Sequence, residues 1–107
     1  MKMRFMNWDC NIVKTHYTNG RIALQLVATA DDLDNDVYEG EPIAMASVNL
    51  PEVSIAADEV FIKDYSENEG MLMALVKAGI VKDTGRRVQS GFVSIPVCKI
   101  IAKELLL

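Results

Sequence analysis

Residues 10–29 read CNIVKTHYTNGRIALQLVAT, and this stretch decides the fold. Asn19-Gly20 in its middle is the strongest short-range signal for a type I′ turn, because both central positions of that turn need positive φ. The turn separates two strand candidates, residues 10–18 and 21–29. We therefore expect an antiparallel hairpin with a two-residue loop, from which the rest of a sheet extends.

The two-residue loop also predicts which side chains of the hairpin share a face. It places Thr18 opposite Arg21 and Val13 opposite Leu26, and a shift of one residue would exchange the two faces. The expected core face consists of Val13, Tyr17, Ile22, Leu24, Leu26 and Ala28. The opposite face consists of Ile12, Lys14, His16, Ala23, Gln25 and Val27.

Further strands are expected on both sides of the hairpin, at residues 3–8, 43–50, 59–64, 86–90 and 92–99. A turn is expected at residues 83–85. Pro96 predicts either an edge position or a bulge for the last strand, since proline cannot donate to a ladder. The apolar tail, residues 100–107, is expected to pack on the domain or against another chain.

A helix is expected over residues 67–78. Ser66 as N-cap and Glu69 three residues later form the pattern of a capping box. Gly79 suits the left-handed position that follows a helix, where Ile80 would contact Leu75 in a Schellman motif. The apolar stripe that docks on the sheet consists of Met71, Leu72, Leu75 and Val76.

Together these elements predict a single domain, residues 1–107, of the α+β class. We expect an antiparallel twisted sheet of five or six strands with one helix packed on a face. No apolar run reaches the ~18 residues of a membrane helix, and the N-terminus lacks the apolar core of a signal peptide. A cytoplasmic location and no membrane partner are therefore expected. Cys10 and Cys98 are expected to be free, partly buried thiols rather than a disulfide or a zinc site.

The charges of the chain are unevenly distributed. The net charge is −4 at pH 7, yet residues 31–69 contain twelve of the 15 acids and a single base, Lys63, so that segment carries −11. The remainder has ten bases and three acids, hence +7. Such asymmetry is evidence about partners rather than about fold. It predicts a protein that presents an acidic face to another molecule.

Six of these acids fall in one loop, residues 30–41, which we expect to be the contact surface: Asp31, Asp32, Asp34, Asp36, Glu39 and Glu41. The three aspartates at 32, 34 and 36 match positions 1, 3 and 5 of an EF-hand calcium loop. However, Val37 replaces the glycine of position 6 and Ile43 the glutamate of position 12. We expect no metal and no cofactor. A solvated loop and a weak divalent-cation site remain the alternatives to a protein contact.

Short strings at four places in the chain occur in an order and spacing that resemble those of a known family. They are Asn19-Gly20-Arg21 with Ala23-Leu24-Gln25-Leu26, then Ser47-Val48-Asn49-Leu50-Pro51, Thr84-Gly85-Arg86 and Ser90-Gly91-Phe92. Across residues 15–97 the chain resembles a family of small uncharacterised bacterial proteins, a domain of unknown function, found on phages, plasmids and conjugative elements of gut Firmicutes. The resemblance implies an accessory protein of a mobile element and supplies no catalytic residues.

These observations favour a non-catalytic protein-binding module whose contact surface is the acidic segment 31–69. One alternative is an acidic mimic of nucleic acid that inhibits a defence protein, which needs regularly spaced charges across one face. Another is a small enzyme or ligand-binding module with a helix–sheet pocket that uses Cys10, His16 or Tyr65. The expected partner is another protein, with a homodimer through the C-terminal tail or an edge strand as a further option. Direct nucleic-acid binding is disfavoured by the negative net charge.

Overall fold

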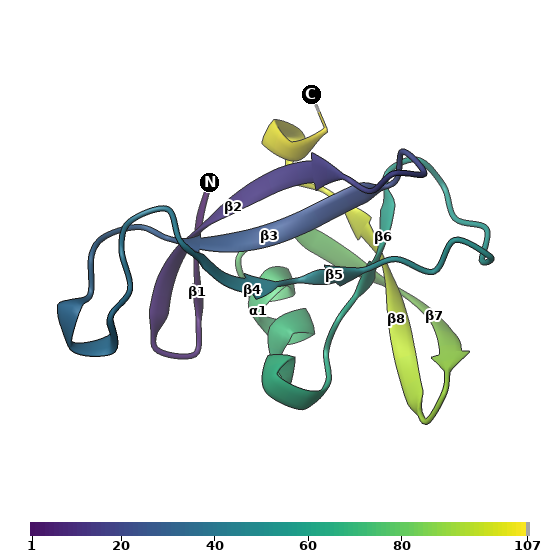
Figure 1. The fold of residues 1–107 in the computed structure, drawn as a ribbon. Helices are drawn as coiled ribbons and strands as arrows, with labels where there is room; N and C mark the ends of the chain where they lie inside the picture. The colour runs from purple at the N-terminus through teal and green to yellow at the C-terminus, as the bar shows by residue number, and fades with distance from the viewer. Residues whose placement is uncertain (107) are drawn as a thin grey trace.

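The computed structural model describes residues 1–106, whose strands form two four-stranded antiparallel sheets rather than one sheet of five or six (Figure 1). The first sheet has the order β1 (Lys2–Phe5), β2 (Trp8–His16), β3 (Ile22–Ala28), β4 (Pro42–Met45). The second has the order β5 (Ser47–Val48), β6 (Glu59–Ile62), β8 (Val93–Ile100), β7 (Val81–Ser90). The helical elements are η1 (Leu33–Asn35), η2 (Ser66–Asn68), α1 (Met71–Lys77) and η3 (Lys103–Leu105). The α+β class and the antiparallel pairing are confirmed.

The single sheet was wrong because the strand expected at 43–50 changes sheets at Ala46. The Ala46 N–H donates to the Leu24 carbonyl of the first sheet at 2.9 Å, and its carbonyl accepts from the Lys63 N–H beside the second sheet at 2.9 Å. Ser47 then turns its side chain back, and its Oγ accepts from the Leu24 N–H at 2.9 Å. The Tyr17 hydroxyl lies 2.8 Å from the same Oγ. One strand thus becomes β4 and β5, and the two sheets meet at a seam formed by Ala46 and Ser47.

The hairpin of β2 and β3 forms, but its register differs by one residue from the expected one. Ile12 pairs with Leu26. The Tyr17 N–H donates to the Arg21 carbonyl at 2.8 Å and the Gly20 N–H to the Tyr17 carbonyl at 2.9 Å. With Gly20 at φ +85°, the loop is a type I turn followed by a left-handed glycine, a three-residue connection.

The altered register exchanges the faces of β2 but not those of β3. Ile12 is buried, at 6 % exposed, whereas Val13 is 37 % exposed, the reverse of the expectation. On β3, the expected core residues Leu24, Leu26 and Ala28 are all buried. A loop that is one residue longer shifts β2 against β3 by one position, and the period of two then carries every β2 side chain to the other face.

The helix is shorter than expected, and a different residue caps it. Ser66 makes no side-chain cap and lies in η2, so the capping box is wrong. Instead, the Asp64 carboxylate oxygen Oδ1 accepts from the Gly70 N–H at 3.1 Å and from the Leu72 N–H at 2.9 Å. The C-terminal end is as expected, because Gly79 has φ +74° and the Ile80 N–H donates to the Leu75 carbonyl at 3.0 Å.

The turn expected at 83–85 is a bulge inside β7. Asp83 pairs with Cys98 and Arg87 with Pro96, so β7 has two more residues than β8 between these pairs. The guanidinium of Arg87 spans the bulge and contacts both carboxylate oxygens of Asp83 at 2.8 Å. Pairing of β8 with β6 stops at Val97. The bulge that Pro96 predicted is therefore present, on the neighbouring strand.

The main core lies between the two sheets and α1, and its fully buried residues include Leu24, Leu26, Ile62, Leu75 and Ile100. A smaller cluster on the second sheet contains Leu50, Phe61, Ile95 and Val97. The C-terminal tail packs on its own domain, since Ala102 and Leu105 are buried in the main core. Within residues 1–106, the structure has no helix of the length and apolar character that crossing a membrane requires.

The seam makes Ser47 a position where one hydroxyl supports both sheets. We expect Ser47→Ala to lower the free energy of unfolding by about 1–3 kcal/mol, because it leaves the buried Leu24 N–H without an acceptor. Tyr17→Phe removes only the outer hydrogen bond and should cost less, about 1 kcal/mol. Urea denaturation of both variants measures the difference. A cost for Ser47→Ala no greater than that for Tyr17→Phe would contradict the role assigned to the seam.

Arg87 lowers the pKa of Asp83 to about 2 from its ordinary 3.8 through their hydrogen bonds, and the Gly85 N–H contributes. Because the folded-state pKa is depressed, the stabilisation from Asp83 is present above pH 3.8 and is lost as the pH falls towards 2. Asp83→Asn should therefore be less stable than the wild type at neutral pH, and the gap in urea midpoint should narrow in acid. Glu52→Gln, an exposed carboxylate elsewhere, is the control. A gap for Asp83→Asn that is unchanged in acid would refute the assignment.

Candidate functional site

The acidic loop, defined as residues 30–41, connects β3 to β4 and extends beyond the end of the first sheet (Figure 1). Its base is held to β3, because the Ala28 N–H donates to the Glu41 carbonyl at 2.8 Å and the Gly40 N–H to the Ala28 carbonyl at 2.9 Å. Beyond this base the loop stands away from the main core. Its charged side chains are therefore presented to solvent rather than to the rest of the domain.

The loop is ordered by two of its own carboxylates. Asp32 caps η1, with its side chain accepting from the Asn35 N–H at 3.4 Å and from the Asn35 side-chain amide at 2.9 Å. Asp31 Oδ1 accepts from the Glu39 N–H at 2.8 Å. The backbone of Asp32 also bridges to Val37. Side-chain hydrogen bonds of this kind are how aspartates stabilise tight loops.

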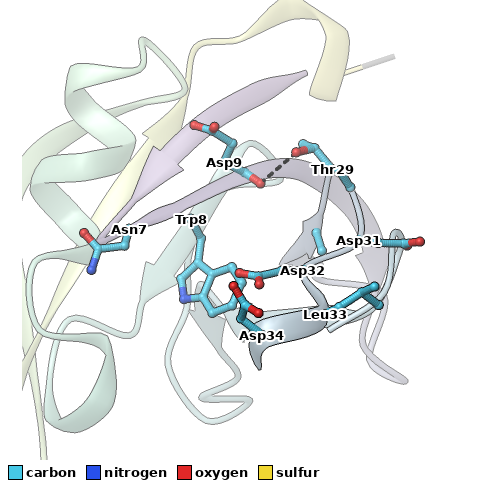
Figure 2. A pocket seen from close by; sticks show the side chains of 10 residues that line it. Asn7, Trp8, Asp9, Thr29, Asp31, Asp32, Leu33 and Asp34 are labelled. Atoms are coloured by element: carbon cyan, nitrogen blue, oxygen red, sulfur yellow. Dashed lines mark hydrogen bonds between the residues drawn. The ribbon is translucent and has the colours of Figure 1, made fainter. Parts of the chain in front are cut away.

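A hollow of about 420 Å³ lies between the acidic loop and the start of β2. Figure 2 shows the indole of Trp8 in this hollow, with the carboxylates of Asp32 and Asp34 turned towards the ring. Asp31 extends away from the ring in the same view. The lining residues are Asn7, Trp8, Asp9, Ala28, Thr29, Ala30, Asp31, Asp32, Leu33 and Asp34. The hollow thus joins an aromatic face to several carboxylates.

Asp9 lies on the opposite wall of the hollow, where both its side chain and its backbone carbonyl have partners. Its carboxylate pairs with Arg4 at 2.9 Å, and its carbonyl accepts from the Thr29 hydroxyl at 3.1 Å. The Thr29 contact appears as the dashed line in Figure 2. Because Arg4 partly neutralises Asp9, the charge of the hollow comes chiefly from the loop side.

The structure brings together three of the six expected contact residues. Asp31, Asp32 and Asp34 line the hollow, whereas Asp36, Glu39 and Glu41 lie further along the loop. Sequence reasoning missed Trp8 at the start of β2 and its neighbour Asn7 in the turn before it. The signal was present, since Trp8 is the single tryptophan of the chain and ends the strand candidate at 3–8. Local sequence patterns do not link Trp8 to the acidic loop, because it is the pairing of β2 with β3 that brings the two together.

The other acids of segment 31–69 lie elsewhere on the molecule. Asp58 precedes β6 and lies 3.6 Å from Lys99, and Glu59, the first residue of β6, accepts from the Ala56 N–H. Asp64 caps α1, and Glu67 pairs with Lys63. The connection between β5 and β6 is at the opposite end of the molecule from the acidic loop (Figure 1). The segment is therefore not one surface, and the acidic loop holds six of its twelve acids.

The residues of the enzyme alternative are dispersed. Cys10 is fully buried in the main core, His16 is exposed near the β2–β3 turn, and Tyr65 packs against the smaller cluster on the second sheet. Burial raises the pKa of Cys10, and it raises that of Cys98 to about 12, with Asp83 adding to the effect. A buried thiol that stays protonated is a poor nucleophile. Within residues 1–106, no group of three or more potential ligands is arranged to hold a metal ion.

No family model, curated protein or solved structure matches this chain. Its candidate site therefore rests on the geometry described above.

Both cysteines should be unreactive in the folded protein. Burial raises the pKa of Cys98 from its ordinary 9.0 to about 12, so very little of this thiol is thiolate at pH 8. We expect Ellman's reagent to modify neither thiol at pH 8 until urea unfolds the chain, after which both react. Rapid labelling of one thiol under native conditions would contradict the burial of that cysteine.

Proposed function

We propose that the protein is a non-catalytic binding module that uses the acidic loop to contact a basic segment of another protein. The observation that carries this proposal is the hollow that Trp8 lines together with Asp32 and Asp34. Lysine and arginine side chains are attracted both to carboxylates and to the face of an indole ring. A basic segment therefore matches this combination better than an apolar or anionic one does.

The proposal is supported by the fact that some carboxylates of the acidic loop stabilise its conformation whereas others are left without a partner in the described residues. Asp31 and Asp32 hold the loop conformation through hydrogen bonds to backbone N–H groups. Asp34 and Glu39 are exposed, and neither side chain has a hydrogen bond or ion pair in the described part of the chain. A loop already ordered before binding loses less conformational entropy when a partner arrives.

The two alternatives have less support. A nucleic-acid mimic needs carboxylates spread regularly over one face, whereas those of segment 31–69 are divided between the loop, the β5–β6 connection and the start of α1. An enzyme would need Cys10, His16 or Tyr65 to share a pocket, and none of the three lines the hollow beside Trp8. The role of accessory protein of a mobile element, in the cytoplasm, is proposed on the family resemblance and on the two free buried cysteines.

The acidic loop can be tested by removing charge without removing its hydrogen bonds. The variant Asp34→Asn/Glu39→Gln/Glu41→Gln leaves Asp31 and Asp32 intact and removes three charges. Its matched control, Glu52→Gln/Glu69→Gln/Glu104→Gln, removes three exposed charges elsewhere. Pull-down from a bacterial lysate should recover basic partners with the wild type and the control, and much less of them with the loop variant.

The partner recovered can then be titrated against the wild type while the fluorescence of Trp8 is followed. A change in emission that weakens with added salt is expected for charge-assisted contact at the hollow. The proposal fails if the loop variant captures the same proteins in the same amounts as the control.

A further inference from the structure

The outer face of α1 is an apolar surface that the domain does not cover. Met71 and Leu75 on its inner face are fully buried, but Met73 is 75 % exposed and Val76, one turn later, 44 % exposed. Most other exposed large apolar side chains stand on loops and at the chain ends, such as Leu33 on the acidic loop and Phe92 at the β7–β8 turn. On α1, by contrast, they are neighbours on one rigid element.

Met73 forms a ridge between two hollows. One, of about 460 Å³, is lined by Arg4, Gly70, Met73, Ala74, Lys77 and Ala78. The other, of about 410 Å³, is lined by Asp64, Gly70, Leu72, Met73, Val76 and Asp83. A ridge with a groove on each side is the shape that a second helix packs against.

The two hollows have opposite charges at their rims. Arg4 and Lys77 border the first, and Asp64 and Asp83 border the second. Arg4 is paired with Asp9, and Asp83 with Arg87. The charges available to a partner are therefore those of Lys77, in the last turn of α1, and Asp64, which caps its first turn.

We propose that this face binds a second copy of the chain, with the two α1 helices antiparallel about a two-fold axis. The rotation places Met73 of each copy in a hollow of the other, and Lys77 of each copy beside Asp64 of the other. A two-fold interface must be complementary to itself, which a face with one basic rim and one acidic rim satisfies. Antiparallel helices also bring opposite ends of their dipoles together.

Other occupants of this face are less favoured. The C-terminal tail cannot cover it, because Ala102 and Leu105 are buried in the main core. A basic or an acidic partner would complement one rim and oppose the other. Since α1 has only seven residues, the interface is small for a stable dimer. We expect a reversible dimer with a Kd of roughly 1–100 μM.

Sedimentation velocity of the full chain, from about 1 μM to 1 mM, tests the proposal. The wild type should shift from monomer to dimer over this range, and Met73→Glu should remain monomeric, a loss of at least roughly tenfold in affinity. Phe92→Glu is the matched control, since Phe92 is fully exposed at the β7–β8 turn. Its dimer should match that of the wild type. A monomeric wild type at every concentration, or a dimer that survives Met73→Glu, would overturn the proposal.

The charge pairing has a separate test. Lys77→Gln removes one charge, and Asp64→Asn removes the other while its side-chain oxygen still caps α1. Each should weaken the dimer roughly 2–5-fold, and the double variant should weaken it no further than one of them alone. Circular dichroism checks that Asp64→Asn retains α1. Fully additive effects of the two substitutions would overturn the antiparallel arrangement.

Discussion

The fold depends on a single small residue, Ala46, at which one strand leaves the first sheet and enters the second. Its N–H is committed to Leu24 and its carbonyl to Lys63, so both backbone groups of this buried residue are satisfied by different sheets. The Leu24 N–H has no backbone acceptor once the strand turns away from the first sheet. The hydroxyl of the next residue, Ser47, accepts this hydrogen bond instead. A buried backbone group without a partner costs about 1–3 kcal/mol, so the switch requires a hydroxyl at position 47 more than it requires any particular shape of core. The two sheets, α1 and the main core are arranged around this seam.

Much of this architecture is predictable from local pattern, and the errors share one physical cause. The hairpin, the Schellman end of α1, the free buried cysteines and the irregularity opposite Pro96 all follow from turn chemistry and periodicity. The register of β2 does not, because Asn-Gly suits both a two-residue and a three-residue loop, and the choice moves every side chain of the strand to the other face. Asp64 as the cap of α1, and the division of residues 43–50 between two sheets, likewise depend on tertiary hydrogen bonds. These contacts join residues distant in sequence or lying outside the usual capping spacing, so no local pattern records them.

Of the residues that form the candidate site, only the carboxylates of the acidic loop were predictable from the sequence. The acidic loop is evident from composition, but Trp8 lies more than twenty residues earlier and reaches the hollow through the pairing of β2 with β3. The strings that carry the family resemblance are also informative about the fold and not about the site. Asn19 donates to Asn49 and Arg21 to the Leu50 carbonyl, so the first two strings hold the β2–β3 turn against the chain after β5. The string at residues 84–86 is the bulge of β7.

The charge asymmetry of the sequence has several structural causes. Asp64 caps a helix, Asp83 and Glu67 neutralise Arg87 and Lys63, and Asp58 faces Lys99. Asp31 and Asp32 maintain a loop. The carboxylates of Asp34 and Glu39 remain, and neither makes a hydrogen bond or an ion pair within residues 1–106. If the loop binds a basic partner as proposed, that partner supplies the opposite charge that Asp34 and Glu39 lack within residues 1–106.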